Sequence, residues 1–187
     1  MGMAGEGAAP QACAWTPSID QLYRETDRLY YTIARGCGIS ECAYWVMYAI
    51  EEAGGSSTMR EVGERWAYSK QTVNSAVKTL EKKGLVELAF VEGSRKAKRL
   101  LFTEAGRELA RRSIVPAMAA ERRAFASLDA AERAELLRLI EKYTRAIDAE
   151  IGYVLRAGGV DPPAVTYSSA PEPSAEASTA CACLETS

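Results

Sequence analysis

The 187-residue chain is 48% hydrophobic and 26% charged, which is ordinary for one globular domain with tails, and no run approaches the ~18 apolar residues of a membrane span. Its formal net charge is −2 and it has no histidine, so the commonest general base and metal ligand of proteins is missing. Five cysteines without regular spacing argue against a disulfide framework and, with no signal-peptide pattern at the N-terminus, predict a reducing, cytoplasmic location.

The N-terminal part of the sequence predicts a leader and two helices. Residues 1–17 are rich in Gly and Ala, which is typical of a disordered leader. A first helix is expected over 18–35, because Ser18 followed by Gln21 has the spacing of a capping box. A second helix is expected over 40–53. It is apolar on most sides, so we expect neighbouring elements to cover it.

The next stretch predicts two short helices joined by a tight turn. Residues 54–56, Gly-Gly-Ser, should break the preceding helix. Thr58 with Glu61 three residues later is a second capping box and opens one helix. Ser69 can cap the next helix, and Gly84 stands where a left-handed residue would end it. Such a pair forms a helix-turn-helix, whose second helix can enter a major groove of DNA.

The second of these helices has one apolar face and one polar face. We expect the apolar face to be buried: Val73, Ala76, Val77 and Leu80. The polar face carries lysines and short hydrogen-bonding side chains, with no acidic residue before Glu81, and this combination suits phosphates and base edges. The candidate DNA contacts here are Ser69, Lys70, Gln71, Thr72, Asn74, Ser75 and Lys78. Ser69 can instead serve only as the helix cap.

Two strand-like segments, 85–90 and 98–102, follow the helix-turn-helix and flank a predicted turn at 92–94. A hairpin with a basic tip beside a helix-turn-helix is a wing, which reaches the DNA backbone or minor groove. Between Ser69 and Arg99 the sequence has eight Lys and Arg against three Glu, a net +5 in a chain whose net charge is −2. The local charge therefore favours a nucleic-acid partner.

The C-terminal half predicts long helices and a tail. One helix should begin after Thr103 and be kinked or interrupted at Pro116. Another should open at an Asp129–Glu132 capping box. Its apolar positions alternate by three and four, the period of a seam between helices: Leu137, Ile140, Thr144, Ile147, Ile151 and Val154. Residues 158–187 are rich in Pro, Ser and Ala and predict a disordered tail.

The first and last helices therefore carry apolar stripes that the DNA-reading segment cannot fully cover. A twofold dimer built from both ends of the chain, with helices over 18–35 and 104–157, would bury both stripes at once, so we expect this arrangement. Twofold symmetry in turn requires a pseudo-palindromic DNA site whose half-sites lie about one helical turn, ~34–36 Å, apart.

Three motifs, in this order and spacing, resemble the MarR (multiple antibiotic resistance regulator) family of winged-helix repressors: 69–73 (Ser-Lys-Gln-Thr-Val), 80–86 (Leu-Glu-Lys-Lys-Gly-Leu-Val) and 102–106 (Phe-Thr-Glu-Ala-Gly). The resemblance implies a mainly α fold with a small β-wing, a DNA-binding lobe over 40–103, and a homodimeric repressor. The family usually has an Asp-Arg pair at the wing tip, where this chain has Ser94-Arg95. The minor-groove role therefore falls on Arg95, and Lys96 beside it should meet a phosphate.

The resemblance also implies a small, aromatic effector between the dimer helices and the winged lobe. Tyr30, Tyr31 and Trp45 are candidates to line that pocket, although aromatic residues at helical spacing also serve simply as core. Alternatively, the protein is a thiol-based redox regulator on the same scaffold, with Cys37 and Cys42 as its sensors. A third alternative is a winged-helix module that binds proteins rather than DNA.

The sequence argues against an enzyme and against a bound cofactor or metal. It has no Gly-rich phosphate loop, no metal-ligand spacing, and no Ser or Cys nucleophile with a histidine to activate it. Cys181 and Cys183 lie close together in the tail, but no His or further Cys accompanies them there, so we expect no zinc site.

Overall fold

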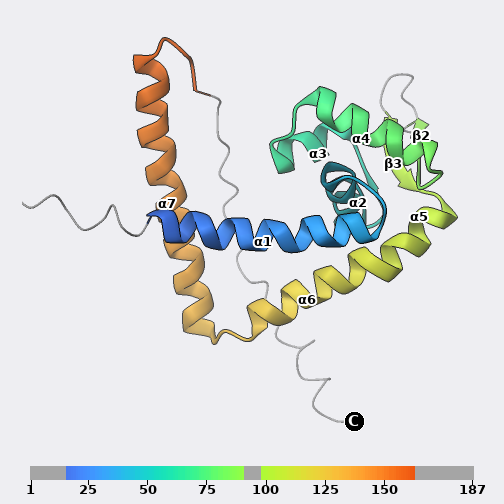
Figure 1. The fold of residues 1–187 in the computed structure, drawn as a ribbon, viewed down its shortest axis with the longest axis horizontal. Coiled ribbons are helices and arrows are strands. Elements are labelled where there is room, and N and C mark those ends of the chain that lie inside the picture. The colour runs from blue at the N-terminus through green and yellow to red at the C-terminus, as the bar shows by residue number, and fades with distance from the viewer. Residues whose placement is uncertain (1–15, 91–97, 163–187) are drawn as a thin grey trace, which may run out of the picture. The chain divides into compact units, whose positions relative to one another are not determined.

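The computed structural model describes residues 16–90 and 98–162. These residues are mainly helical and include a small three-stranded antiparallel sheet (Figure 1), which confirms the predicted fold class. They form two compact units: a winged-helix unit that runs to Ser127 and a C-terminal unit that begins at Leu128. No helix in the described part of the chain is long and apolar enough to cross a membrane.

Helices α1 (Thr16–Gly36) and α2 (Glu41–Glu52) open the winged-helix unit. The predicted start of α1 was wrong: the helix begins at Thr16, so Ser18 lies inside it and Gln21 donates to Glu25 instead of closing a capping box. Pro17 explains the earlier start, since a proline in the first turn fixes a helical φ and its missing N–H costs nothing there.

Helix α2 is the central element, as its all-round apolar sequence predicted. Ser40 caps it by accepting a hydrogen bond from the backbone N–H of Ala43 at 3.2 Å. Seven of its twelve residues are buried: Ala43, Tyr44, Val46, Met47, Tyr48, Ala49 and Ile50. The core continues from this helix into α4 (Lys70–Lys82), β3 (Lys98–Phe102) and the run formed by α5 (Glu104–Leu109) and η2 (Ala110–Ile114), where Leu80, Leu100 and Ile114 are fully buried.

Helices α3 (Met59–Trp66) and α4 (Lys70–Lys82) form the predicted helix-turn-helix. The capping box of α3 is complete, with Glu61 N–H donating to Thr58 Oγ1 at 3.1 Å and Thr58 N–H donating to Glu61 Oε2 at 2.7 Å. Ala67, in the turn between the helices, has φ 51° and is the one non-glycine residue of the described chain with positive φ. The left-handed residue turns the chain within three positions, and α4 then begins after its cap Ser69.

The sheet has the order β1-β3-β2, from β1 (Ser56–Ser57), β2 (Val86–Phe90) and β3 (Lys98–Phe102). The two predicted wing strands are confirmed, and Val86 pairs with Phe102 while Phe90 pairs with Lys98. The sequence did not predict β1, because two serines after Gly54-Gly55 have no strand periodicity. This strand exists through its pairing with β3, 43 residues later, where the Arg99 guanidinium donates to Ser56 Oγ and to the Ser56 carbonyl.

After the wing, α5 (Glu104–Leu109), the π-helical turn η2 (Ala110–Ile114) and α6 (Val115–Ala126) form one helical run (Figure 1). The α-helix is interrupted just before Pro116, as predicted, although the backbone stays helical through the proline. The interruption is a turn of the wider π winding. Such a turn accommodates a ring that lacks an N–H and would clash with the carbonyl four residues earlier in an ordinary α-helix.

Up to residue 162, where the described part of the chain ends, the C-terminal unit contains one helix, α7 (Ala130–Ala157). Its predicted capping box is present, with Glu132 N–H donating to Asp129 Oδ1 and Asp129 N–H donating to Glu132 Oε2, both at 2.8 Å. Gly158 and Gly159 end the helix, as predicted. The apolar side chains of the seam are all exposed in the single chain: Leu137, Ile140, Ile147, Ile151 and Val154.

Candidate nucleic-acid interface

The outer face of α4 is polar and open to solvent. Its inner face, Val73, Ala76, Val77 and Leu80, is buried as the spacing predicted. Of the residues predicted to meet DNA, the exposed ones are Ser69, Lys70, Gln71, Thr72, Ser75 and Lys78, and Asn74 is half-buried at the edge of the same face. The fold therefore brings the helix candidates together on one surface, with no acidic residue between Lys70 and Lys78.

Two of these side chains are already engaged at the start of α4. The Ser69 hydroxyl accepts a hydrogen bond from Thr72 N–H at 3.1 Å, and the two hydroxyl oxygens lie 2.8 Å apart. This is the N-cap geometry, so Ser69 and Thr72 first of all fix the direction in which α4 starts. A hollow of about 400 Å³ lies beside them, lined by Gln71, Thr72 and Ser75 together with Ser40 and Cys42 of the α2 start.

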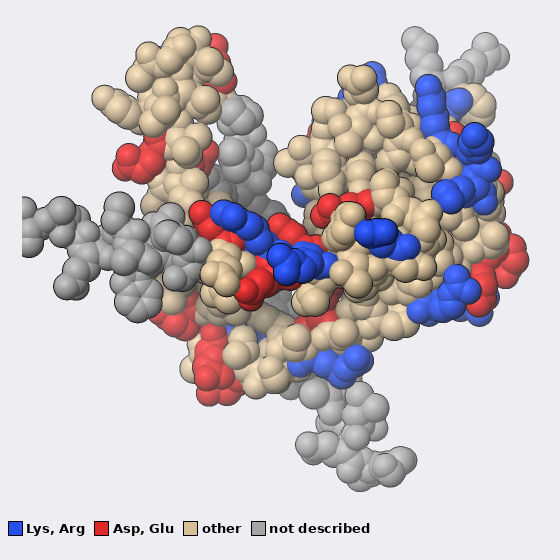
Figure 2. Space-filling model, in the orientation of Figure 1, with Lys and Arg blue, Asp and Glu red and all other residues tan. Residues whose placement is uncertain are grey.

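The wing contributes cations unequally. Lys98 is exposed, and its Nζ lies 5.0 Å from the centroid of the Phe90 ring, which is 62% exposed. Arg99 is not available to contact DNA, because its guanidinium donates hydrogen bonds to Ser56 within the sheet. Arg95 and Lys96, predicted to reach the minor groove and a phosphate, lie outside the described residues. Figure 2 shows Lys and Arg gathered around the end of this unit where α4, β2 and β3 lie.

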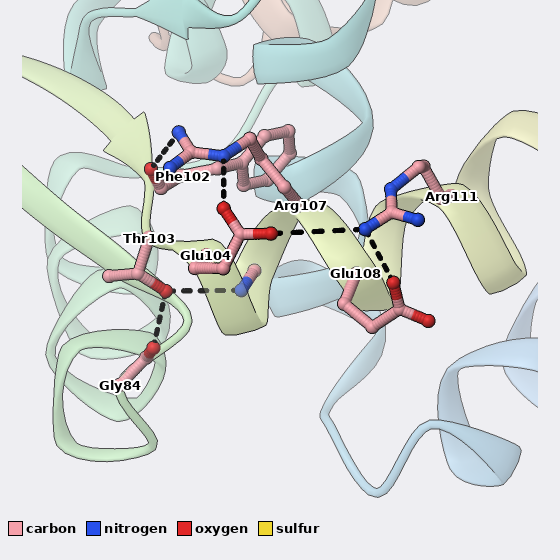
Figure 3. A network of polar contacts seen from close by, with 8 residues as sticks. Gly84, Phe102, Thr103, Glu104, Arg107, Glu108 and Arg111 are labelled. Carbon is pink, nitrogen blue, oxygen red and sulfur yellow. Dashed lines mark hydrogen bonds and ion pairs between the residues drawn. The ribbon is translucent and has the colours of Figure 1, made fainter.

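The base of the wing is fixed to α5 by a short polar network (Figure 3). The Thr103 hydroxyl donates to the Gly84 carbonyl at 2.5 Å and accepts from Gly106 N–H at 3.0 Å, while Thr103 N–H donates to the Leu85 carbonyl at 3.2 Å. Gly84 itself has φ +67°, the left-handed conformation predicted for the residue that ends α4. The segment 102–106 therefore joins three elements: the end of α4, the wing and α5.

Two arginines of this region, Arg107 and Arg111, are paired with carboxylates (Figure 3). Arg107 donates to the Phe102 carbonyl at 3.0 Å and lies 3.2 Å from the Glu104 carboxylate. Arg111 is 2.5 Å from Glu108 and 3.9 Å from Glu104. These ion pairs are more than half exposed, so they add little stability. They do neutralise the charges of Arg107 and Arg111, whereas Arg112 on the π turn and Lys70 and Lys78 on α4 remain exposed.

A cluster of aromatic rings lies between α1, α2 and α3. Trp45 is at its centre, with ring centroids 4.7 Å from Tyr30 and 4.2 Å from Trp66. Tyr44 and Tyr48 complete the cluster. Two of the three predicted effector-pocket residues, Tyr30 and Trp45, are thus brought together. Tyr31 is not, because it faces another side of α1 and its ring lies beneath the Arg35 guanidinium at 5.8 Å.

The cluster ends at a carboxylate that the sequence did not single out. Glu121, on α6, accepts hydrogen bonds from the Tyr30 hydroxyl at 2.8 Å and from the Tyr48 hydroxyl at 2.6 Å. Burial, followed by these bonds to Glu121, raises the pKa of both tyrosines well above 10. No local signal could have found the contact, since Tyr30 and Glu121 are 91 residues apart. A hollow of about 500 Å³ adjoins it, lined by Tyr48, Glu51, Glu52, Val115, Met118, Glu121 and Arg122.

The Cys42 thiol does not have the environment of a reactive cysteine. Cys37 and Cys42 are free and half-buried. Burial, and secondarily the neighbouring Glu41 carboxylate, raises the pKa of the Cys42 thiol, whereas a redox sensor needs a lowered one. Across residues 16–90 and 98–162 no group of three Cys, Asp or Glu side chains could hold a metal ion. Cys13, Cys181 and Cys183 lie outside these ranges.

The comparisons with known proteins agree with this geometry. Residues 38–99 match the family model described as the MarR family. A MarR family regulator from Neisseria meningitidis has a TM-score of 0.61 and 23% identity, covering 78% of this chain and 99% of that one. A MarR family regulator from Listeria monocytogenes, solved with a 26mer DNA, has a TM-score of 0.58 and 20% identity, with 81% and 97% covered.

A third similar structure is that of Staphylococcus aureus MarR in complex with salicylate and kanamycin. Its TM-score is 0.56 at 17% identity, with 73% of this chain and 91% of that one covered. At these identities the structures show a shared fold. No curated protein sequence matches the chain at a significant level.

Proposed function

Residues 38–99 match the MarR family model, and from this match we propose that the chain is a MarR family regulator that binds double-stranded DNA as a homodimer to control transcription. Members of this family are transcription regulators and not enzymes. The observation that carries the proposal is the outer face of α4, which is exposed, polar, lysine-bearing and free of acidic residues from Lys70 to Lys78. The similar Listeria regulator was solved with DNA, which supports the same partner here.

Each residue of the interface has a proposed role that follows from its chemistry. Gln71, Asn74 and Ser75 would read base edges, because amides and hydroxyls both donate and accept hydrogen bonds. Lys70 and Lys78 would neutralise phosphates. Arg95 would enter the minor groove and Lys96 would meet a phosphate, as the motif at the wing tip implies. Ser69 and Thr72 would act mainly through the cap that orients α4.

Salt-dependent DNA binding tests these roles. Fluorescence anisotropy on a duplex selected by the wild-type protein from a random library should give a log–log slope against salt that falls by roughly two in Lys78→Ala and in Arg95→Ala, because the dimer loses one cation from each subunit. Lys142→Ala, which removes the same charge from exposed α7, is the matched control and should leave the slope unchanged. Asn74→Ala should relax the preference at one base pair. A wild-type protein indifferent to duplex DNA at low salt would refute the proposal.

The dimer is proposed from apolar surface that a single chain leaves in water. Leu22 and Leu29 of α1 are 65% and 66% exposed, and Ile151 and Val154 of α7 are 52% and 63% exposed. Helices with such stripes normally bury them against a partner, and a twofold partner covers both ends of the chain at once. Sedimentation equilibrium should return twice the 20.3 kDa mass of the chain. A monomer at micromolar concentration would contradict the proposed twofold reading of DNA.

Ligand response and repression form the finer part of the proposal. Trp45 packs against Tyr48, which lines a hollow with Met118 and three carboxylates, those of Glu51, Glu52 and Glu121. The ring and the carboxylates would contact and hydrogen-bond a small aromatic effector that carries a hydroxyl group. The Staphylococcus aureus relative was solved with salicylate, which supports this ligand class. An effector of this kind would act by binding one arrangement of the dimer more tightly than the other. Measuring operator affinity in the presence of a panel of aromatic acids and phenols tests the proposed ligand response. If no compound in the panel changes the affinity, the ligand response is refuted.

A further inference from the structure

The carboxylate of Glu121 is held by one tyrosine from each of two other helices. Tyr30 of α1 donates to Oε1 at 2.8 Å, and Tyr48 of α2 donates to Oε2 at 2.6 Å. Each carboxylate oxygen therefore has a phenol of its own, and such charge-assisted bonds are roughly twice as strong as neutral ones. One side chain thus joins α1, α2 and α6, and we call this arrangement the Glu121 clamp.

Helix α6 continues the helical run of α5 and η2, and its own side chains add few further contacts to the core. None of its residues is buried, and Met118 is only partly buried against the core. Within residues 16–90 and 98–162, no α6 side chain other than Glu121 forms a hydrogen bond with a different element. Since burial of an apolar face is what normally fixes a helix in place, the clamp is the main side-chain contact that holds α6 against α1 and α2, in addition to its continuity with η2.

The two tyrosines are rigid partners. The Tyr30 ring lies 4.7 Å from Trp45, and the Tyr48 ring lies 5.3 Å from Trp45 and 5.8 Å from Trp66. Their raised pKa values keep both hydroxyls protonated, and therefore able to donate, at any neutral pH. Packed rings with fixed donors define one position for the carboxylate, and hence one direction for the helix that carries it.

Helix α6 ends at Ala126, and the C-terminal unit begins at Leu128, so α6 is the covalent connection between the two units. We propose that Glu121 is a positioning residue that sets the separation of the two α4 helices in the homodimer, and with it the half-site spacing that the protein accepts. The inference rests on the proposed DNA-binding function. A small change in the direction of α6 is enough to alter the spacing by one base pair. A tilt of about 10° moves the end of a helix of this length, about 16 Å, by about 3 Å. One base pair advances DNA by about 3.4 Å.

The test measures spacing selectivity rather than affinity alone. Half-sites are first selected with the wild-type protein from a random duplex library. They are then placed in inverted repeats with the selected spacer and with spacers longer by one and two base pairs. Wild-type affinity should fall at least about tenfold for each added base pair, because each step misplaces the second half-site by a distance and a rotation that the rigid dimer cannot follow.

Three variants break the clamp in different ways. Glu121→Ala removes the hydrogen-bond acceptor, and alanine preserves the helix propensity at this position of α6. The double variant Tyr30→Phe with Tyr48→Phe removes only the donors. Glu121→Gln keeps one acceptor oxygen and should be intermediate. The matched control is Glu25→Ala, because Glu25 accepts a hydrogen bond only from Gln21 on its own helix.

Glu121→Ala and the double tyrosine variant should bind the three spacings within about threefold of one another, while their binding to a single half-site stays at the wild-type level. A triple variant that combines Glu121→Ala with the two tyrosine substitutions should lose no more spacing selectivity than either alone, because both changes remove the same hydrogen bonds. Wild-type spacing selectivity in a folded Glu121→Ala protein would overturn the inference and leave the proposed function intact. If circular dichroism shows that Glu121→Ala does not fold, wild-type spacing selectivity in the folded double tyrosine variant would overturn the inference instead. If the wild-type protein binds no duplex, the proposed function fails and the inference fails with it.

Discussion

Replacing Gly106 with alanine should destabilise the winged-helix unit, although alanine is the better helix former. Gly106 lies in the first turn of α5 and packs against the residues that lead into β2. A Cβ atom at this position would lie 1.8 Å from the carbonyl oxygen of Leu85 and 2.9 Å from its carbonyl carbon. Both are backbone atoms, so the overlap can be relieved only if α5 moves away from the base of the wing.

The size of that effect follows from the contacts that would be lost. The Cβ–oxygen distance must open from 1.8 Å to at least 3.0 Å. That movement stretches the Thr103 N–H to Leu85 carbonyl bond, now 3.2 Å, and the Thr103 hydroxyl to Gly84 carbonyl bond, now 2.5 Å. Two hydrogen bonds at about 1 kcal/mol each and about 1–3 kcal/mol of overpacking are offset by about 1 kcal/mol of helix propensity. The free energy of unfolding should therefore fall by about 2–4 kcal/mol.

Urea unfolding followed by circular dichroism measures this loss, at one fixed protein concentration because a dimer's stability depends on concentration. Gly36→Ala is the matched control. Gly36 is the last residue of α1, a Cβ there meets nothing within 4 Å, and its φ is not positive. That variant should be unchanged or more stable by up to about 1 kcal/mol. If Gly106→Ala unfolds at the wild-type urea midpoint, the close approach of α5 to Leu85 is refuted.

Three further predictions concern the caps, the clamp and the response to alkali. Ser69→Ala should lower the free energy of unfolding by about 1 kcal/mol, because it removes the cap of α4. Ser69→Asp should keep the cap, but its negative charge should weaken DNA binding. Equal DNA binding by both variants would contradict this. Tyr48→Phe should lower the stability of the winged-helix unit by about 1.5–3 kcal/mol, the range for a hydrogen bond to a charged acceptor, and an unchanged urea midpoint would show that the bond is not formed in solution. Burial raises the pKa of Tyr44 and Tyr68 to about 12 from an ordinary value of 10.0, so the unfolded chain loses these protons before the folded one does. Stability should therefore be complete below pH 10 and fall as the pH rises from 10 towards 12, and a urea midpoint that stays constant over this range would count against it.

The parts of the fold that the sequence predicted are those that local chemistry determines. The caps of α3, α4 and α7 each depend on a side chain and a backbone N–H only three residues apart, and Thr58, Ser69 and Asp129 all form them. Helix α2 was predicted to be central because almost every position along it is apolar. The left-handed Gly84 and the two wing strands likewise follow from short patterns.

The parts that the sequence did not predict depend on distant contacts. Strand β1 has two residues and exists only because β3 lies beside it. The π turn before Pro116 is one of several ways to accommodate a proline, and the pattern of residues does not choose between them. The Glu121 clamp is the largest omission at the candidate site. Nothing near Glu121 marks it apart from other exposed glutamates, and its role appears only once the fold brings Tyr30 and Tyr48 to it.

The stacked pair Trp45 and Trp66 gives this protein an optical probe of its own. The two indoles belong to α2 and α3, with centroids 4.2 Å apart and planes inclined by 30°. Chromophores at that separation couple strongly, so their near-ultraviolet dichroism reports on the packing of the central helix against the first helix of the helix-turn-helix. Any event that slides one helix past the other should change this signal without an added label.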